Sequence, residues 1–181
     1  MKEELLSEDP GLEIEVIDIE IFTRDGRIPP HGKHYKVKVG AHYFVFHQQW
    51  VTGKEILEKA GYTSLECHWL FQLIRGCELE RVELDQKVDL ARPGIEHFLV
   101  TPTEVFQYTV DGEPETTVHK ELTPNQILED AGIKPVSDYY LVKVNADGSQ
   151  ISYKDKPDTP ITMVCPAVKF VSVFKGETPV S

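Results

Sequence analysis

Cysteine is scarce in this sequence: only three of the 181 residues are cysteines, and they lie far apart at Cys67, Cys77 and Cys165. An odd number of widely spaced cysteines does not form the paired framework of a small secreted protein. The first four residues, Met-Lys-Glu-Glu, also lack the basic and apolar segments of a secretory signal peptide. We therefore expect a protein of the reducing cytoplasm, in which Cys165 is a small apolar filler.

Long apolar runs and basic residues are also in short supply. No run approaches the roughly 20 apolar residues that a membrane-spanning helix needs. Nineteen Lys and Arg residues stand against thirty Asp and Glu residues, which gives a net charge of -11. Because this charge repels phosphate backbones and anionic lipids, we expect neither nucleic acid nor a membrane surface as a partner.

Motifs that carry out chemistry are missing as well. Cys67 lies beside His68, but adjacent side chains point in different directions, and no glycine loop is present that could stabilise an oxyanion. His42 and His47 are five residues apart, which places them on opposite faces of a strand, and there is no Cys-x-x-Cys or His-Glu-x-x-His motif. We therefore expect no catalytic residues, no metal and no cofactor, and we predict that the protein is not an enzyme.

An internal repeat is the clearest feature that the sequence does contain. The stretch TGKEILEKAG at 52–61 returns as TPNQILEDAG at 123–132. Each copy begins with a threonine N-cap, has Glu or Gln three residues later as in a capping box, continues with an apolar Ile-Leu pair and ends on glycine. The repeat predicts two short helices of the same kind.

Short alternating runs surround both predicted helices in the same order. A hairpin precedes each helix, and single strands follow it. The predicted strands are 35–39, 43–46, 69–73 and 97–100 in the first copy, and 106–110, 116–118, 140–144 and 169–174 in the second. The order predicts an α+β fold with two tandem ββαβββ units at 34–102 and 105–176, joined by a linker at 103–104. One helix packed across a mixed sheet is the β-grasp arrangement.

The core of each unit is expected between its helix and its sheet. In the first unit the expected core residues are Ile56, Leu57, Ala60, Leu70, Leu73, Leu84, Leu90 and Phe98. In the second unit they are Ile127, Leu128, Ala131, Leu141, Val144, Ile161 and Phe170.

Several stretches resemble the prokaryotic multiubiquitin domain family, whose members are built from tandem ubiquitin-like β-grasp units. They are YKVKVGAHYFVFHQQWVTGKEILEKAG, LFQLIRGCELERVELDQKVDL and PGIEHFLV in the first unit, and TPNQILEDAG, YLVKV and YKDKPDTPI in the second. The resemblance implies a bacterial protein modifier, or its scaffold. Its partners would be ubiquitin-activating-like and conjugating-like enzymes and a deubiquitinase-like peptidase.

The chemistry of a modifier takes place at its C-terminus, where the terminal carboxylate is adenylated and finally passed to an amine. A Gly-Gly end is favoured because a tail without side chains threads a narrow channel. This sequence has one glycine there, followed by a tail at 177–181. We expect processing or conjugation at Gly176, Glu177 or Ser181; the alternatives are an unusual terminus or a copy that is never conjugated.

Residues 1–33 form an N-terminal arm that belongs to neither unit. Its stretch 12–22 alternates β-branched with acidic residues, apart from a phase slip, and this pattern predicts an interaction strand. The apolar residues of this strand are Ile14, Val16, Ile17, Ile19 and Ile21. Two alternatives stay open: the strand pairs within its own chain, or it pairs with a neighbouring copy and builds a head-to-tail assembly.

The sheet face turned away from the helix recruits partners in ubiquitin-like folds. In the first unit Trp69 and Phe71 could supply such a partner face, and in the second Tyr140 and Val142 could do so. The alternative is that these side chains cover the sheet or the contact between the units.

These observations lead to one expected function and two alternatives. We expect a bacterial ubiquitin-like modifier whose C-terminal tail is processed, activated and conjugated by separate enzymes. The alternative is a self-assembling scaffold that is not conjugated and forms head-to-tail oligomers or filaments through the N-terminal strand. A sulfur carrier ranks third, because that role also needs a Gly-Gly end and normally a single domain.

Overall fold

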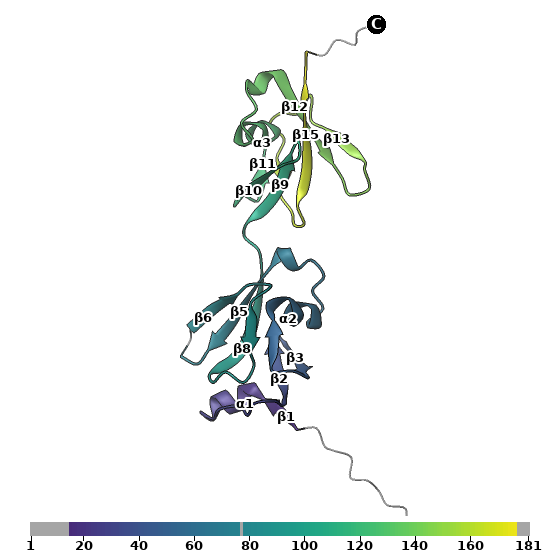
Figure 1. Ribbon diagram of the computed structural model, residues 1–181. Coiled ribbons are helices and arrows are strands. Elements are labelled where there is room, and N and C mark those ends of the chain that lie inside the picture. Colours follow the sequence, from purple (N-terminus) through teal and green to yellow (C-terminus); the bar gives the residue numbers. More distant parts are fainter. Residues whose placement is uncertain (1–14, 77, 177–181) are drawn as a thin grey trace, which may run out of the picture. The chain divides into compact units, whose positions relative to one another are not determined.

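The computed structural model describes residues 15–76 and 78–176, which divide into two compact units (Figure 1). The first unit comprises residues 15–65 and 69–101, and the second comprises residues 66–68 and 102–176. Both are mixed α+β structures with many strands and few helices, an arrangement compatible with the β-grasp fold.

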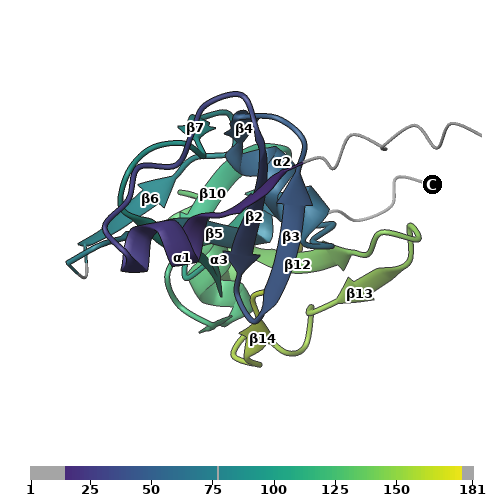
Figure 2. The ribbon, with the colours of Figure 1, turned by 90° about the horizontal axis from the view of Figure 1, so that it is seen from below.

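The first unit is built on one large sheet whose strand order is β1-β2-β8-β5-β6, with β3 also paired to β2 (Figure 1). A separate small sheet joins β4 to β7 (Figure 2). Its elements are β1 (Val16–Asp18), α1 (Ile19–Arg24), β2 (His34–Val39), β3 (His42–Phe46), β4 (Trp50–Thr52), α2 (Gly53–Lys59), β5 (His68–Ile74), β6 (Glu78–Val82), β7 (Lys87–Asp89) and β8 (Ile95–Pro102).

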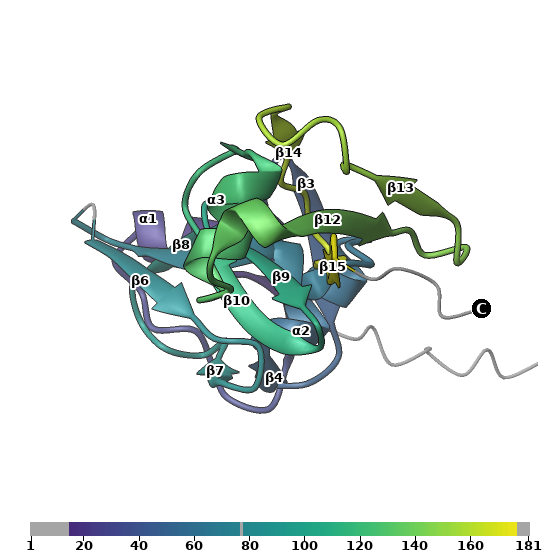
Figure 3. The ribbon, with the colours of Figure 1, turned by 90° about the horizontal axis from the view of Figure 1, so that it is seen from above.

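The second unit has a five-stranded sheet of order β10-β9-β15-β12-β13 and a small sheet of β11 with β14 (Figure 3). Its elements are β9 (Phe106–Val110), β10 (Glu113–Thr117), β11 (Glu121–Leu122), α3 (Pro124–Asp130), the short 3-10 helix η2 (Val136–Asp138), β12 (Tyr139–Val144), β13 (Gln150–Ser152), β14 (Ile161–Thr162) and β15 (Val168–Phe174). The C-terminal strand β15 lies at the centre of the large sheet, parallel to β9 and antiparallel to β12.

Both repeated helices form as the sequence predicts, with the same reciprocal cap. In α2 the hydroxyl of Thr52 accepts from the Glu55 amide at 3.2 Å, and the Glu55 carboxylate accepts from the Thr52 amide at 2.6 Å. In α3 Thr123 and Gln126 make the same two bonds, at 3.2 and 2.8 Å. The bond from the Thr52 backbone lowers the pKa of Glu55 from its ordinary value, and a bond from the Thr52 hydroxyl adds to this effect.

Most of the expected core residues are buried. Ile56, Leu57, Leu70, Leu90 and Phe98 in the first unit and Ile127, Leu128, Leu141, Ile161 and Phe170 in the second are at most 4% exposed. Ala60 and Ala131 are partly buried and pack against the same two cores.

Three expected core residues lie outside the cores. Leu73 is three residues from Leu70 on β5, and Val144 is three residues from Leu141 on β12, so each lies on the opposite face of its strand. Leu84 is 37% exposed beyond the end of β6. The expectation for these three was wrong: hydrophobic character alone does not tell which face of a strand Leu73 and Val144 occupy, and Leu84 lies outside the strands.

Buried tyrosines on β2 and β9 complete the two cores. Tyr35 on β2 and Tyr108 on β9 have 0% and 1% exposure. The Tyr35 hydroxyl donates to the Pro30 carbonyl at 2.6 Å. The Tyr108 hydroxyl has no hydrogen-bond partner among the described residues, and burial raises its pKa to about 12.

A disulfide joins Cys67 to Cys165, which lie 98 residues apart in the sequence and 5.5 Å apart at their Cα atoms. Cys67 ends a short 3-10 helix, η1 (Leu65–Cys67), and its carbonyl accepts from the Thr103 amide at 2.9 Å. Cys165 is therefore not the apolar filler that we expected. A reducing cytoplasm would keep this pair as two thiols, so the redox state of the pair depends on the compartment.

We expect Glu55→Gln to keep the cap of α2 and to remove its dependence on acid pH. Because the folded-state pKa of Glu55 is lowered, its ionised form stabilises the fold above the ordinary value of 4.5, and this contribution is lost as the pH falls through the lowered value. Between pH 6 and 3 the wild type should therefore lose more free energy of unfolding than Glu55→Gln. Urea unfolding followed by tryptophan fluorescence measures this, since both tryptophans, Trp50 and Trp69, lie in the first unit.

Gln126→Glu provides the reciprocal variant. It should introduce the same acid sensitivity into the second unit, monitored by far-UV circular dichroism. Thr52→Ala should cost about 1 kcal/mol at neutral pH, because it removes the cap itself. Equal acid sensitivity of wild type and Glu55→Gln would contradict this account.

The disulfide predicts a specific thiol count for protein purified without reductant. One thiol, that of Cys77, should react with a thiol reagent in denaturant before reduction, and all three cysteines should react after it. Cys165→Ser should expose two thiols before reduction, whereas Cys77→Ser should expose none. Three reactive thiols in the unreduced wild type would show that the bond is not formed.

Candidate functional site

The N-terminal arm forms a short strand and a helix instead of the strand expected over 12–22. The strand β1 stops at Asp18 because the Asp18 carboxylate caps α1, accepting from the Ile21 amide at 3.3 Å. Ile17 and Ile19 are 2% and 1% exposed and belong to the core of the first unit. Val16 and Ile21 are 44% and 39% exposed. Ile14 lies outside the described residues.

The arm pairs within its own chain. Strand β1 runs parallel to β2, with Val16 opposite His34 and Asp18 opposite Lys36. One edge of β2 is paired with β3 along residues 35–39. The opposite edge is shared by two strands: β1 pairs at residues 34–36, and β8 pairs farther along at Val39. Thr23, at the buried side of α1, donates its hydroxyl hydrogen to the carbonyl of Ile95 on β8 at 2.6 Å. The pairing present in the structure is therefore the intrachain alternative.

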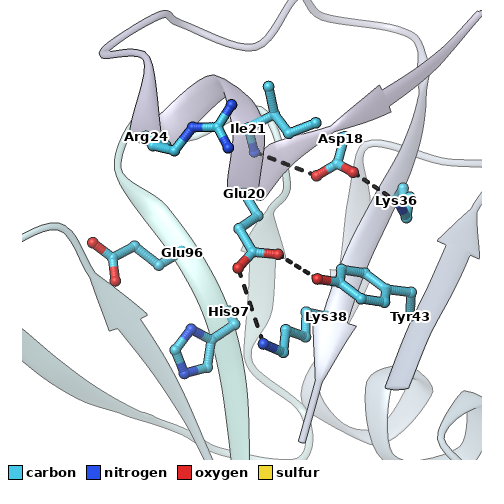
Figure 4. A pocket seen from close by; sticks show the side chains of 9 residues that line it. All are labelled: Asp18, Glu20, Ile21, Arg24, Lys36, Lys38, Tyr43, Glu96 and His97. Carbon is cyan, nitrogen blue, oxygen red and sulfur yellow. Dashed lines mark hydrogen bonds and ion pairs between the residues drawn. The ribbon is translucent and has the colours of Figure 1, made fainter. Parts of the chain in front are cut away.

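Acidic residues of the arm meet basic residues of β2 in a surface hollow of about 610 Å³ (Figure 4). Asp18 lies 2.9 Å from the Lys36 ammonium, and Glu20 lies 4.0 Å from that of Lys38. The Tyr43 hydroxyl on β3 donates to Glu20 at 2.7 Å. We call these five residues the arm clamp.

The arm clamp shifts the pKa values of two of its members. The hydrogen bond to Asp18 raises the pKa of Lys36, and the hydrogen bond to Glu20 raises the pKa of Tyr43. In both cases the protonated form is the one that makes the bond. The clamp therefore holds at neutral pH and weakens in alkali.

The rest of the hollow carries no excess of one charge. Its remaining lining residues are Ile21, Arg24, Glu96 and His97. Figure 4 shows Glu96 and His97 on β8, across from the helix that carries Glu20 and Arg24. Among the described residues, no group of three or more His, Cys, Asp or Glu side chains is placed to hold a metal ion.

Sequence reasoning missed the arm clamp, although a signal for it exists. Asp18 and Glu20 are two residues apart, as are Lys36 and Lys38 on β2. Two acidic and two basic residues at matching spacing can pair across neighbouring elements. What the sequence did not show is that the arm runs parallel to β2 in this register.

The expected partner face of the first unit is half covered by its own side chains. Trp69 and Phe71 lie on the same side of β5, with their ring centres 6.5 Å apart in an edge-to-face arrangement. The Arg81 guanidinium lies 4.8 Å from the centre of the Trp69 ring. These contacts leave both aromatic rings partly accessible to solvent.

The expected partner face of the second unit is divided in the same way. Tyr140 and Val142 lie on one side of β12, and Tyr140 is half-buried with the Lys154 ammonium 5.7 Å from its ring centre. Val142 is only 8% exposed. Two neighbouring residues on β15, Val171 and Val173, face Val142 and Tyr140 in the register.

Hydrogen bonds hold the chain after the C-terminal strand β15 as far as Lys175. The Lys175 amide donates to the Asp138 carbonyl at 2.7 Å, and its ammonium donates to the Ser137 carbonyl at 2.8 Å. Gly176 follows and is exposed. A Cβ atom at Gly176 would come within 2.8 Å of Cζ on the Phe174 ring, so a larger residue there would require this exposed ring to shift. Of the other expected processing residues, Glu177 and Ser181 lie outside the described residues.

The geometry of the first unit narrows its fold class before any comparison. A single capped helix, α2, contributes Ile56 and Leu57 to the core beneath a mixed sheet, which is compatible with a β-grasp. Residues 35–103 match the family model described as Multiubiquitin. The resemblance seen in the sequence is therefore confirmed for this stretch, which covers most of the first unit. A search of curated proteins found no match.

Among the described residues, no helix is both long enough and apolar enough to span a bilayer.

We expect the arm clamp to make the first unit sensitive to alkali. Because the folded-state pKa values of Lys36 and Tyr43 are raised, their contribution is present below the ordinary values of 10.5 and 10.0 and is lost as the pH rises through the raised values. Lys36→Gln and Tyr43→Phe should therefore lose less free energy of unfolding than the wild type between pH 9 and 11.5. Urea unfolding followed by tryptophan fluorescence provides the measurement.

Lys87→Gln is the matched control, because Lys87 is an exposed lysine of the same unit outside the clamp. It should follow the wild-type pH profile. If Lys36→Gln and Tyr43→Phe follow that profile too, the clamp is not the group that titrates.

Proposed function

We propose that this chain is a bacterial ubiquitin-like protein modifier whose C-terminal tail is processed, activated and conjugated by separate enzymes. In this proposal two tandem ubiquitin-like β-grasp units, preceded by the N-terminal arm, carry the tail. The multiubiquitin domain at 35–103 supports the ubiquitin-like character of the first unit. The reciprocal cap shared by α2 and α3 supports the extension to the second.

The observation that carries the proposal is that the hydrogen-bonded part of the chain ends at Lys175 and is followed directly by the exposed Gly176. Lys175 is fixed to the end of η2 by two hydrogen bonds, while Gly176 is exposed directly after it. A peptidase that cuts after Gly176 would leave a carboxylate on a residue without a side chain, just beyond a rigid strand. Such a carboxylate is accessible to adenylation, to transfer onto a cysteine as a thioester, and then to attack by an amine.

The proposed role assigns catalysis to the partners and not to this chain. The partners are a ubiquitin-activating-like enzyme, a conjugating-like enzyme and a deubiquitinase-like peptidase, acting in the cytoplasm. Recognition by these proteins would use the half-covered faces at Trp69 and Phe71 and at Tyr140 beside the buried Val142, since each combines an accessible aromatic ring with a nearby cation.

The proposal is tested by incubating the full chain with these three enzymes, ATP and Mg²⁺. Intact-mass spectrometry should find the chain shortened to end at Gly176, and peptide mapping should find Gly176 joined to a lysine of an acceptor. A chain that stays intact and unattached with all three enzymes active would overturn the proposal.

Gly176→Ala should block both steps. Because the added methyl also presses on the Phe174 ring, the variant Phe174→Leu with Gly176→Ala is needed to relieve that contact. If the double variant remains blocked, the enzymes require glycine itself. Phe174→Leu alone should be processed and conjugated like the wild type.

The alternative function, head-to-tail assembly through the N-terminal strand, ranks second. For exchange between copies, Ile17 and Ile19 would have to leave the core of their own unit, where they are 2% and 1% exposed. Each would have to find an equivalent site in a neighbouring copy. The intrachain pairing of β1 with β2 supplies no observation that favours this exchange.

A further inference from the structure

Two histidines from neighbouring strands face each other at one end of the β2–β3 pair. His34 is the first residue of β2, and His47 directly follows the last residue of β3. The antiparallel register pairs Tyr35 with Phe46, and its next step places His34 opposite His47. Directly opposite residues of antiparallel strands have Cβ atoms about 4.5–5.5 Å apart, so the two imidazoles can reach a common point.

The distance between their ring nitrogens is suitable for a shared metal ion. The two Nδ1 atoms are 3.2 Å apart, and the rings are inclined at 83° with centres 4.6 Å apart. Imidazole nitrogens bind Zn²⁺ at about 2.0–2.1 Å, which separates two nitrogens on one ion by about 2.9 Å at a right angle and about 3.4 Å at the tetrahedral angle. The observed separation lies between these two values.

The backbone that carries His34 is held in place before any ion binds. The Tyr35 hydroxyl donates to the Pro30 carbonyl at 2.6 Å, and the Gly32 amide donates to the Gln49 side chain at 3.1 Å. Gln49 in turn donates to Asp89 at 2.8 Å. Because this backbone is already ordered, placing His34 as a ligand costs little backbone freedom.

The surroundings of His47 are open to an ion. His47 lines a hollow of about 330 Å³ together with Glu55, Glu58 and Lys59. His47 is exposed and His34 half-buried, so water can complete the coordination of an ion. Neither carboxylate is needed as a ligand, since Glu55 is engaged by the cap of α2 and Glu58 lies 3.8 Å from the Lys54 ammonium.

We propose that His34 and His47 bind one divalent transition-metal ion through their Nδ1 atoms. In the absence of metal the pair is joined by a hydrogen bond from one Nδ1–H, and the ion takes the place of that proton. Imidazole ligands select Cu²⁺, Ni²⁺ and Zn²⁺ over Mg²⁺ and Ca²⁺, which prefer oxygen. With two protein ligands the ion exchanges with solvent, and Cu²⁺ should bind most tightly.

The experiment is calorimetric titration of the full chain, without a polyhistidine tag, with Cu²⁺, Ni²⁺, Zn²⁺ and Mg²⁺ separately. The wild type should bind one transition-metal ion per chain and no Mg²⁺. His34→Gln and His47→Gln should each weaken the affinity by about tenfold or more, because one ligand remains. Zn²⁺ should also raise the midpoint of tryptophan-monitored unfolding in the wild type and not in these variants.

His42→Gln is the matched control, because His42 lies at the other end of the same strand pair, opposite Val39. It should bind like the wild type. Undiminished affinity in both His34→Gln and His47→Gln would overturn the proposal, and so would an equal loss in His42→Gln.

Discussion

Burial of Ile17 and Ile19 is the interaction on which the rest of the first unit depends. Their side chains belong to the buried core of the first unit, and each contributes about 1.5–3 kcal/mol relative to exposure. The same burial holds β1 along β2 and turns the chain into α1 at Asp18. As a result an arm that precedes the repeats is part of the fold and not an appendage.

The surface chemistry follows from this insertion. With the arm in place, Asp18 and Glu20 lie against Lys36, Lys38 and Tyr43. Their carboxylates form ion pairs and a hydrogen bond that hold the arm against β2 and β3. Two of the candidate functional groups lie at the ends of strands: the histidine pair at the start of β2 and Gly176 after β15. The candidate partner faces lie along β5 and β12 instead.

The sequence predicted local secondary structure far better than it predicted which face of a strand is buried or which distant segments pair. The capped helices, the hairpins and the strands of both units follow from hydrogen bonds and side-chain alternation within a few residues. Leu73 and Val144 were misassigned because a step of three residues along a strand changes its face. The arm was misassigned because alternation alone did not reveal that Asp18 would cap a helix.

The sequence by itself determined the two repeated helices, the order of the strands around them and the resemblance to multiubiquitin domains, since each is encoded within short stretches. Tertiary structure alone decided that Cys67 meets Cys165, that His47 meets His34 rather than His42, and that the arm lies beside β2. These pairings depend on strand register and on the packing of distant segments, and the spacing of residues along the chain specifies neither the register nor the packing.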